Sequence, residues 1–360
     1  MTPPPADTAA LSTRSVLAGE GSGGGTLPDW APYGAFGGAL VFCAAVLAAL
    51  GWFTIALMLV FGCLVAIVAI YAWSRPVEGP RRAKDRAITM AIVAAFGVAM
   101  APLISLLYEV VVRGAKGISW EFFTSDARGV VGGGGAEHAI VGTLIITGVA
   151  AVISVPIGIM AAIYMNEYGR GPLRRALTFF VDVMTGIPSI VAGLFAYALF
   201  ELFFGPGIRM GVMGSIALTV LMIPIVIRSA EEVLKIVPNH LREASYALGT
   251  PKWKTITKVV LPTAFAGLVT GVMIATARII GETAPLLVTT GVVDSLNTNP
   301  FSGRMQNLAV YAYNEYRSPG VMKQASYDRA WAAALTLIAI VMILNVIARL
   351  VYRRYKTEIR

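Results

Sequence analysis

The segment "LREASYALGTPKWKTITKVVLP" (residues 241–262) is a polar stretch between two long apolar runs. It contains one glutamate, one arginine and three lysines. Pro238 opens a helical pattern, which ends at Gly249 and Pro251, because glycine accepts a left-handed helix cap and proline cannot continue the hydrogen-bond ladder. A second helical pattern, residues 252–260, leads into the next apolar run. The segment therefore predicts two short helices joined at a glycine.

The rest of the chain has the composition of a membrane protein. Of its 360 residues, 57% are hydrophobic and 14% are charged, and the mean hydropathy is +0.72. The apolar residues gather in runs of about 20, which is the length that a helix needs to cross the hydrocarbon core of a bilayer. Only helices and closed barrels satisfy their backbone there, and these runs lack the alternation of barrel strands. The expected fold class is an all-α polytopic membrane protein.

We expect eight membrane spans. They cover about residues 33–50, 52–73, 87–111, 140–165, 176–204, 212–230, 262–290 and 330–350. The first two spans share one apolar run, which is too long for a single span, and a turn near Gly51 and Trp52 makes them an N-terminal transmembrane hairpin, residues 33–74. Residues 1–32 are rich in Pro, Gly, Ser and Thr, so we expect a disordered tail.

The distribution of basic residues predicts the orientation. Four segments on one side, residues 75–86, 166–175, 228–258 and 349–360, hold 19 Lys and Arg, whereas the opposite loops hold eight. Since basic loops are retained in the cytoplasm, both termini are expected there, including the 351–360 tail. The formal net charge of +9 mostly reflects this bias, so the high isoelectric point does not indicate a nucleic-acid partner.

The polar segment carries a recognisable spacing. Its residues are Glu243, Ala244, Ser245, Gly249, Val259, Leu261 and Pro262. This spacing resembles the signature of bacterial ABC-importer permeases, with a serine in place of the second alanine and a valine in place of the isoleucine. The resemblance implies that residues 231–258 form a coupling loop, seated on a separate ATPase subunit. From periodicity alone, an interfacial amphipathic helix remains an alternative.

Three further stretches resemble the PstA type of phosphate permease. They are "GIPSIVAGLF" (186–195), "IPIVIRSAEEVLKIVP" (223–238) and "ARIIGETAPLL" (277–287). The likeness covers about residues 87–350, so it implies a six-helix ABC permease core. The hairpin lies outside this core. The sequence does not indicate what the hairpin does.

Two arginines in predicted spans are candidates for the substrate pathway. Arg278 lies deep in its span, where a charge is costly, and Glu282 follows four residues later, which predicts the same helix face one turn away. The two could form a structural ion pair, or the Arg278 guanidinium could offer a forked donor to an oxyanion, with the Thr283 hydroxyl beside it. Pro285 is expected to open the helix and free backbone groups. Arg228, at the inner end of its span, could instead reach lipid phosphates. The resemblance implies that it belongs to the anion route.

The chain contains no G-x-x-x-x-G-K-[ST] motif, so it is not expected to hydrolyse ATP or to bind a cofactor. ATP and Mg²⁺ would be bound by the partner. His138 and His240 lie far apart and predict no metal site. Cys43 and Cys63 are expected to be packing residues rather than a disulfide.

The sequence thus favours the transmembrane subunit of an ATP-driven phosphate importer in a bacterial plasma membrane. The resemblance implies alternating access and three partners: a homologous second permease, an ATPase dimer and an extracytoplasmic phosphate-binding protein. A permease for molybdate or sulfate is the main alternative. An ion-coupled secondary carrier is disfavoured because buried carboxylates are isolated and no broken-helix repeat is visible. A membrane enzyme is disfavoured by the lack of a catalytic cluster.

Overall fold

The computed structural model describes residues 26–128 and 134–355, with side chains up to residue 350. Every regular element in these ranges is a helix, which confirms the all-α prediction. The chain divides into two compact units, one ending at Leu107 and the other starting at Tyr108. Residues 1–25 of the predicted tail and residues 356–360 lie outside the described ranges.

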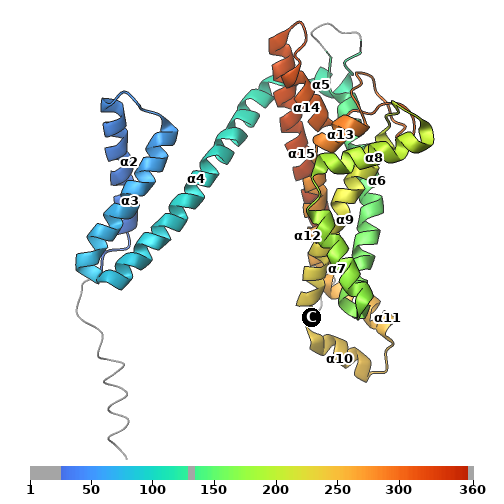
Figure 1. Ribbon diagram of the computed structural model, residues 1–360, viewed down its shortest axis with the longest axis horizontal. Helices are drawn as coiled ribbons and strands as arrows, with labels where there is room; N and C mark the ends of the chain where they lie inside the picture. The colour runs from blue at the N-terminus through green and yellow to red at the C-terminus, as the bar shows by residue number, and fades with distance from the viewer. Residues whose placement is uncertain (1–25, 129–133, 356–360) are drawn as a thin grey trace, which may run out of the picture. The chain divides into compact units, whose positions relative to one another are not determined.

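The first unit contains a helical hairpin. Helices α2 (Ala31–Ala49) and α3 (Ile55–Glu78) lie side by side (Figure 1), and the chain turns between them at Gly51, whose φ of 71° is in the left-handed region. The unit also contains the first part of α4 (Pro80–Gly117), which is longer than the predicted span in both directions. The two cysteines are free and buried.

The second unit is a bundle built around α9 (Gly211–Ile236). The apolar window of α9 is 61% buried, against 28% in α6 (Glu137–Ile163) and 22% in α15 (Lys323–Tyr355). Small residues let the backbones approach, since a Cβ on Gly158 of α6 would lie 2.6 Å from the Cγ1 of Val226. Helix α12 (Leu261–Ile280) packs on the opposite flank of this centre, and residues of α6, α9 and α12 share one apolar core.

The remaining elements are short. They are α5 (Trp120–Thr124), the π-helix η1 (Tyr164–Tyr168), α7 (Pro172–Thr185), α8 (Ser189–Phe204), α10 (Asn239–Ala247), α11 (Lys252–Thr255), the π-helix η2 (Ile256–Val260), α13 (Ala284–Thr289) and α14 (Leu308–Arg317). In the second unit, α10 and α11 lie at one end of the bundle, whereas α8, α13 and α14 lie at the other (Figure 1).

Two predicted spans are not continuous. The span predicted at 176–204 is broken into α7 and α8, which meet at 105°. Pro188 lacks a backbone N–H and restricts the residue before it, so the helix stops after Thr185. The span predicted at 262–290 ends at Ile280 and resumes only as α13. The described residues contain seven helices that are long and apolar enough to cross a membrane. The number rises to eight if α7 and α8 together are counted as one bent span.

Candidate functional site

The polar segment folds as the sequence predicts. Helix α10 ends at Ala247, the chain turns at Gly249 with a φ of 72°, and α11 and η2 then lead into α12. The hydroxyls of Ser245 and Thr255 hydrogen-bond at 2.9 Å and tie the two helices together. Leu261 and Pro262 form the first turn of α12, where a missing N–H is tolerated.

The tip of this loop presents apolar side chains to solvent. Leu248 is 85% exposed and Trp253 is 62% exposed, and both flank the turn at Gly249. Glu243 and Ala244 are also exposed. A pair of large apolar side chains on a loop that protrudes from one end of the unit (Figure 1) is typical of a contact surface for another protein.

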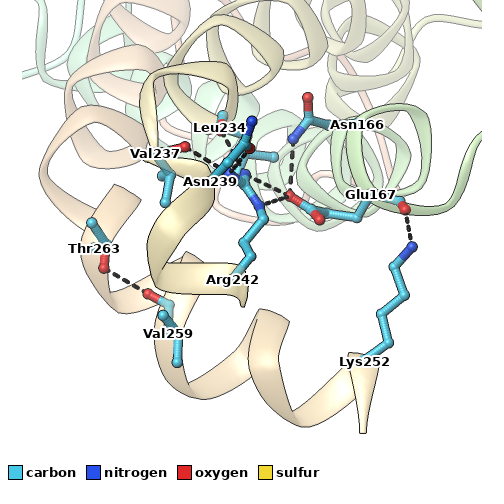
Figure 2. A network of polar contacts seen from close by, with 9 residues as sticks. All are labelled: Asn166, Glu167, Leu234, Val237, Asn239, Arg242, Lys252, Val259 and Thr263. Carbon is cyan, nitrogen blue, oxygen red and sulfur yellow. Dashed lines mark hydrogen bonds and ion pairs between the residues drawn. The ribbon is translucent and has the colours of Figure 1, made fainter. Parts of the chain in front are cut away.

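The inner side of the loop is held by a buried arginine that the sequence analysis does not single out. Figure 2 shows Arg242 of α10 reaching the carboxylate of Glu167 in η1, with Nη2 and Nε at 2.8 and 3.2 Å from Oε1. The same guanidinium donates to the carbonyl oxygens of Leu234 (3.0 Å) and Val237 (2.6 Å) at the end of α9, and to Asn239 Oδ1 (3.2 Å).

The Arg242–Glu167 pair is largely withdrawn from solvent, because the side chains are 13% and 6% exposed. The second helix of the loop is attached at the same place. Lys252 of α11 donates to the backbone oxygen of Glu167 (Figure 2). The ammonium of Lys252 also lies 4.8 Å from the ring centre of Tyr168. Both helices of the loop are therefore anchored on η1, which continues α6.

The two arginines proposed for the pathway have different surroundings. Arg228 of α9 is ion-paired with Asp182 of α7 and lies 3.1 Å from Glu231. Lys235 binds the other oxygen of Glu231 at 2.8 Å. Two cations thus face two carboxylates, so the Arg228 guanidinium is already neutralised in this conformation.

Arg278 lies in the last turn of α12, and Gly281 caps that helix. Glu282 comes after the cap, so the prediction that Arg278 and Glu282 share one helix face is wrong. The Arg278 side chain is exposed, and within residues 26–128 and 134–355 it has no hydrogen-bond or ion-pair partner. This guanidinium is available to a ligand.

The break between α12 and α13 is held by neighbouring elements. The Glu282 carbonyl oxygen accepts a hydrogen bond from the Asn307 side chain at 3.4 Å, and the Thr283 hydroxyl lies 3.5 Å from the Gly281 oxygen. A Cβ on Gly193 of α8 would lie 2.6 Å from the Cα of Pro285, so only glycine allows α8 to approach α13 this closely. The helix break that follows Arg278 is thus held in place by Asn307 and by the close packing of α8 on α13.

Two more arginine side chains, those of Arg209 and Arg304, pack against the loop that follows α13. A Cβ on Gly291 would lie 2.9 Å from the Cδ of Arg209 and 3.3 Å from the Cδ of Arg304. In the part of the chain that the structure describes, neither guanidinium has a hydrogen-bond or ion-pair partner. The sequence analysis counts both only as loop charges. Because the two lie far apart in the chain, only their packing on Gly291 reveals the pair.

The described residues contain no group of three or more His, Cys, Asp or Glu side chains that could hold a metal ion. His138 and His240 lie on different elements, α6 and α10.

Residues 154–359 match the family model of the binding-protein-dependent transport system inner membrane component. The chain is 43% identical over 281 residues to the phosphate transport system permease protein PstA 1 of Mycobacterium tuberculosis (strain CDC 1551 / Oshkosh), covering 77% of this chain and 91% of that protein. It is 38% identical over 282 residues to the phosphate transport system permease protein PstA of Yersinia pestis, covering 77% and 92%.

A solved structure supports the fold. It is the bacterial alginate ABC transporter in complex with an alginate pentasaccharide-bound periplasmic protein, which matches with a TM-score of 0.56 at 14% identity. The match covers 78% of this chain and 99% of that chain. At this identity the match indicates a shared fold and nothing about the ligand.

Proposed function

Because the chain belongs to the family of binding-protein-dependent transport system inner membrane components, we propose that it forms the permease subunit of an ATP-driven importer of inorganic phosphate in a bacterial inner membrane. Two phosphate transport permeases of 43% and 38% identity cover most of this chain and support the choice of substrate. Such a subunit does not hydrolyse ATP itself. ATP and Mg²⁺ are bound by its ATPase partner.

The observation that carries the choice of an anion is the environment of Arg278. A charged side chain within a membrane span is costly unless it faces a polar partner or a water-filled route, and Arg278 has no partner among the described residues. Arginine offers a planar fork that matches two oxygens of a phosphate. The free fork of Arg278 and the nearby Thr283 hydroxyl offer hydrogen-bond donors to a tetrahedral oxyanion.

Arg209 and Arg304 extend this site toward an entrance. Both lie in loops at the end of the bundle where α8 and α13 are found, and their charges are not balanced by ion pairs among the described residues. Two neighbouring cations raise the local concentration of an anion. Phosphate released by a binding protein would meet this pair first and Arg278 next.

Coupling to ATP would use the loop at the opposite end. Leu248 and Trp253 contact the ATPase subunit, and the anchored loop transmits closure of the ATPase dimer to the bundle. Alternating access then exposes Arg278 to one side of the membrane at a time. A homologous second permease completes the pathway.

The proposal is tested by reconstituting the chain with its partner permease, ATPase and phosphate-binding protein in vesicles. Phosphate is expected to stimulate ATP hydrolysis and to accumulate inside. Excess sulfate and molybdate serve as competitors. Stimulation by either of these anions at concentrations where phosphate has no effect would reassign the substrate.

We also propose that both termini face the cytoplasm, and single cysteines test this topology. Ser295→Cys and Thr250→Cys are introduced after the two native cysteines are replaced by alanine. An impermeant thiol reagent added to intact cells should label residue 295, in the loop after α13, and leave residue 250 unlabelled. In permeabilised cells both should react. The reverse pattern in intact cells would invert the orientation.

The turn at Gly249 should be required for assembly with the ATPase. A β-branched residue at a φ of 72° is strained by about 1–2 kcal/mol, whereas asparagine tolerates this conformation. A Cβ added at Gly249 would meet no atom within 4 Å. A loss of ATPase binding would therefore come from backbone strain and not from a steric clash within the chain. Gly249→Val should therefore lower ATPase co-purification about tenfold, and Gly249→Asn should keep it. Equal recovery of the ATPase with both variants would show that the turn at Gly249 does not position the loop for ATPase binding.

A further inference from the structure

The first unit contains a cavity of about 890 Å³ that no part of the proposed transport cycle uses. It opens between the hairpin and α4, and all of its lining residues fall between Thr26 and Val98. This part of the chain lies before the residues that match the family model. The cavity is amphiphilic, because charged side chains lie at one end and apolar side chains line the rest.

The charged end contains one free cation and two free anions. Arg82, Asp29 and Asp85 line the cavity, and none of them has an ion-pair or hydrogen-bond partner in the part of the chain that the structure describes. Arg82 and Asp85 are three residues apart on α4, so they lie on the same face. A ligand that carries both a phosphate and an ammonium would satisfy them together.

The other two charged residues at this end are already satisfied. Arg86 lies 2.7 Å from Glu78 in an ion pair, and Glu78 also accepts hydrogen bonds from the backbone N–H of Leu27 at 2.8 Å and from the Ser74 hydroxyl at 2.5 Å. This network fixes the segment before α2 against α3 and α4. The network forms one edge of the cavity, here called the rim. The unpaired charges of Arg82, Asp29 and Asp85 are available to a ligand.

An apolar stripe of α4 continues from the rim. Met90, Val93, Ala94 and Gly97 recur at helical spacing and line the cavity with Phe36 of α2. At about 1.5 Å per residue, the stripe from Arg82 to Gly97 runs about 22 Å, which is about half of a bilayer of roughly 40–45 Å including its headgroups. A Cβ on Gly97 would meet nothing within 4 Å, so open space continues to this glycine.

Aromatic side chains place the charged end at a membrane interface. Trp30 precedes α2 and Trp73 lies near the end of α3, and their rings meet edge to face at 6.1 Å. Both are partly exposed, as indoles at the headgroup level are. The charged end therefore lies at headgroup depth and the apolar stripe lies in the hydrocarbon.

We propose that this cavity binds one phospholipid with a phosphoethanolamine headgroup, its phosphate on Arg82, its ammonium on Asp85 and Asp29, and one acyl chain along α4 as far as Gly97. An anionic headgroup would face the two carboxylates of Asp29 and Asp85 with one unpaired guanidinium, that of Arg82, among the described lining residues. A choline headgroup has no N–H to donate to them. With the orientation proposed above, the lipid belongs to the inner leaflet.

The experiment uses the full chain in vesicles of phosphatidylcholine that contain a small fraction of phosphatidylethanolamine with a photoreactive acyl chain. After illumination, the labelled peptides are identified by mass spectrometry. Label is expected on the α4 stripe near Gly97. Unlabelled phosphatidylethanolamine should compete about tenfold better than phosphatidylcholine or phosphatidylglycerol, the ratio expected for one added charge-assisted hydrogen bond.

Two substitutions separate a bound lipid from ordinary surrounding lipid. Gly97→Phe fills the open space and should remove the label, whereas Gly37→Phe, at an equally open glycine of α2 outside the cavity lining, should keep it. Arg82→Gln combined with Asp29→Asn and Asp85→Asn should keep the label and abolish the preference among headgroups. Labelling that is unchanged by Gly97→Phe, equal competition by all three lipids with the natural chain, or stronger competition by phosphatidylglycerol would overturn the proposal.

Discussion

Phosphate uptake by the assembled importer is expected to fall by at least about 100-fold when Arg278 is replaced by glutamine, since the forked pair of charge-assisted hydrogen bonds is lost and each is worth about 1.5–3 kcal/mol. The complex should still assemble and hydrolyse ATP at its basal rate. The reason is that Arg278 has no ion pair to lose among the described residues, so its removal leaves no unpaired carboxylate behind. Uptake of labelled phosphate and ATP hydrolysis are measured on the same vesicles.

Three further variants identify the cause of the loss. Arg278→Lys keeps the charge and loses the fork, so uptake should be intermediate. Arg228→Gln is the matched control in which stability rather than transport should fail first, because it leaves Asp182 without its partner and Glu231, whose side chain is 7% exposed, with Lys235 alone. If Arg278→Gln combined with Glu282→Gln restored uptake to the natural level, the role of Arg278 would be to neutralise the Glu282 carboxylate. Arg278 would then not contact the transported anion.

The membrane class and the helix–glycine–helix form of residues 241–262 could be predicted because their signals are local. Apolar runs of about 20 residues indicate helices without knowledge of their neighbours. The turn at Gly249 follows from glycine and proline chemistry, which acts over a few residues. The turn at Gly51 was predictable for the same reason.

The break in the span predicted at 176–204 was missed, although Gly186 and Pro188 were visible, because an average over the apolar residues on both sides reports one long span. In the span predicted at 262–290, Pro285 indicated an opening, but the helix already ends at Ile280. The late position had a chemical consequence, because it placed Glu282 one helical turn above Arg278. Weighting Pro188 and Gly281 as breakers would have predicted both positions.

Long-range pairs could not be predicted from one sequence. Arg242 and Glu167 are 75 residues apart, and Arg228 and Asp182 are 46 apart. Each partner also has a local explanation, since Arg242 lies in a basic loop and Asp182 near a helix break. Which arginine pairs with which carboxylate depends on how α6, α7 and α9 pack. That packing is determined by the shapes of the side chains and not by the spacing of residues along the chain.

Loosening the Arg242–Glu167 pair is expected to uncouple ATP hydrolysis from transport. Removing one partner of a buried ion pair costs about 3–5 kcal/mol, because the remaining charge is left desolvated. Glu167→Gln keeps the shape of the side chain and removes its charge, so the attachment of Arg242 to η1 weakens from an ion pair to a hydrogen bond with a neutral acceptor, while its bonds to α9 and the contact of Lys252 with the Glu167 backbone remain. Movement of the loop should then be transmitted less effectively to α6.

The ATPase should still bind to Glu167→Gln, since Leu248 and Trp253 at the tip of the loop are separate from the pair. The measured quantity is the number of phosphate ions transported per ATP hydrolysed, together with the amount of co-purified ATPase. Arg242→Lys should lower this ratio as well, because one ammonium cannot reach acceptors on α9, α10 and η1 at once. Lys258→Gln, at an exposed basic residue of η2, is the matched control and should leave the ratio unchanged.

Exchange of the two charges tests whether attraction alone is sufficient. In the variant with Glu167→Arg and Arg242→Glu, the attraction is kept, but a carboxylate on α10 would face the carbonyl oxygens of Leu234 and Val237, which accept hydrogen bonds from the natural arginine. The exchange should therefore fail to restore coupling. If Glu167→Gln left the ratio of phosphate to ATP unchanged, the loop would act on the bundle through its connections to α9 and α12 and through Lys252, and the Arg242–Glu167 pair would serve the stability of the fold alone.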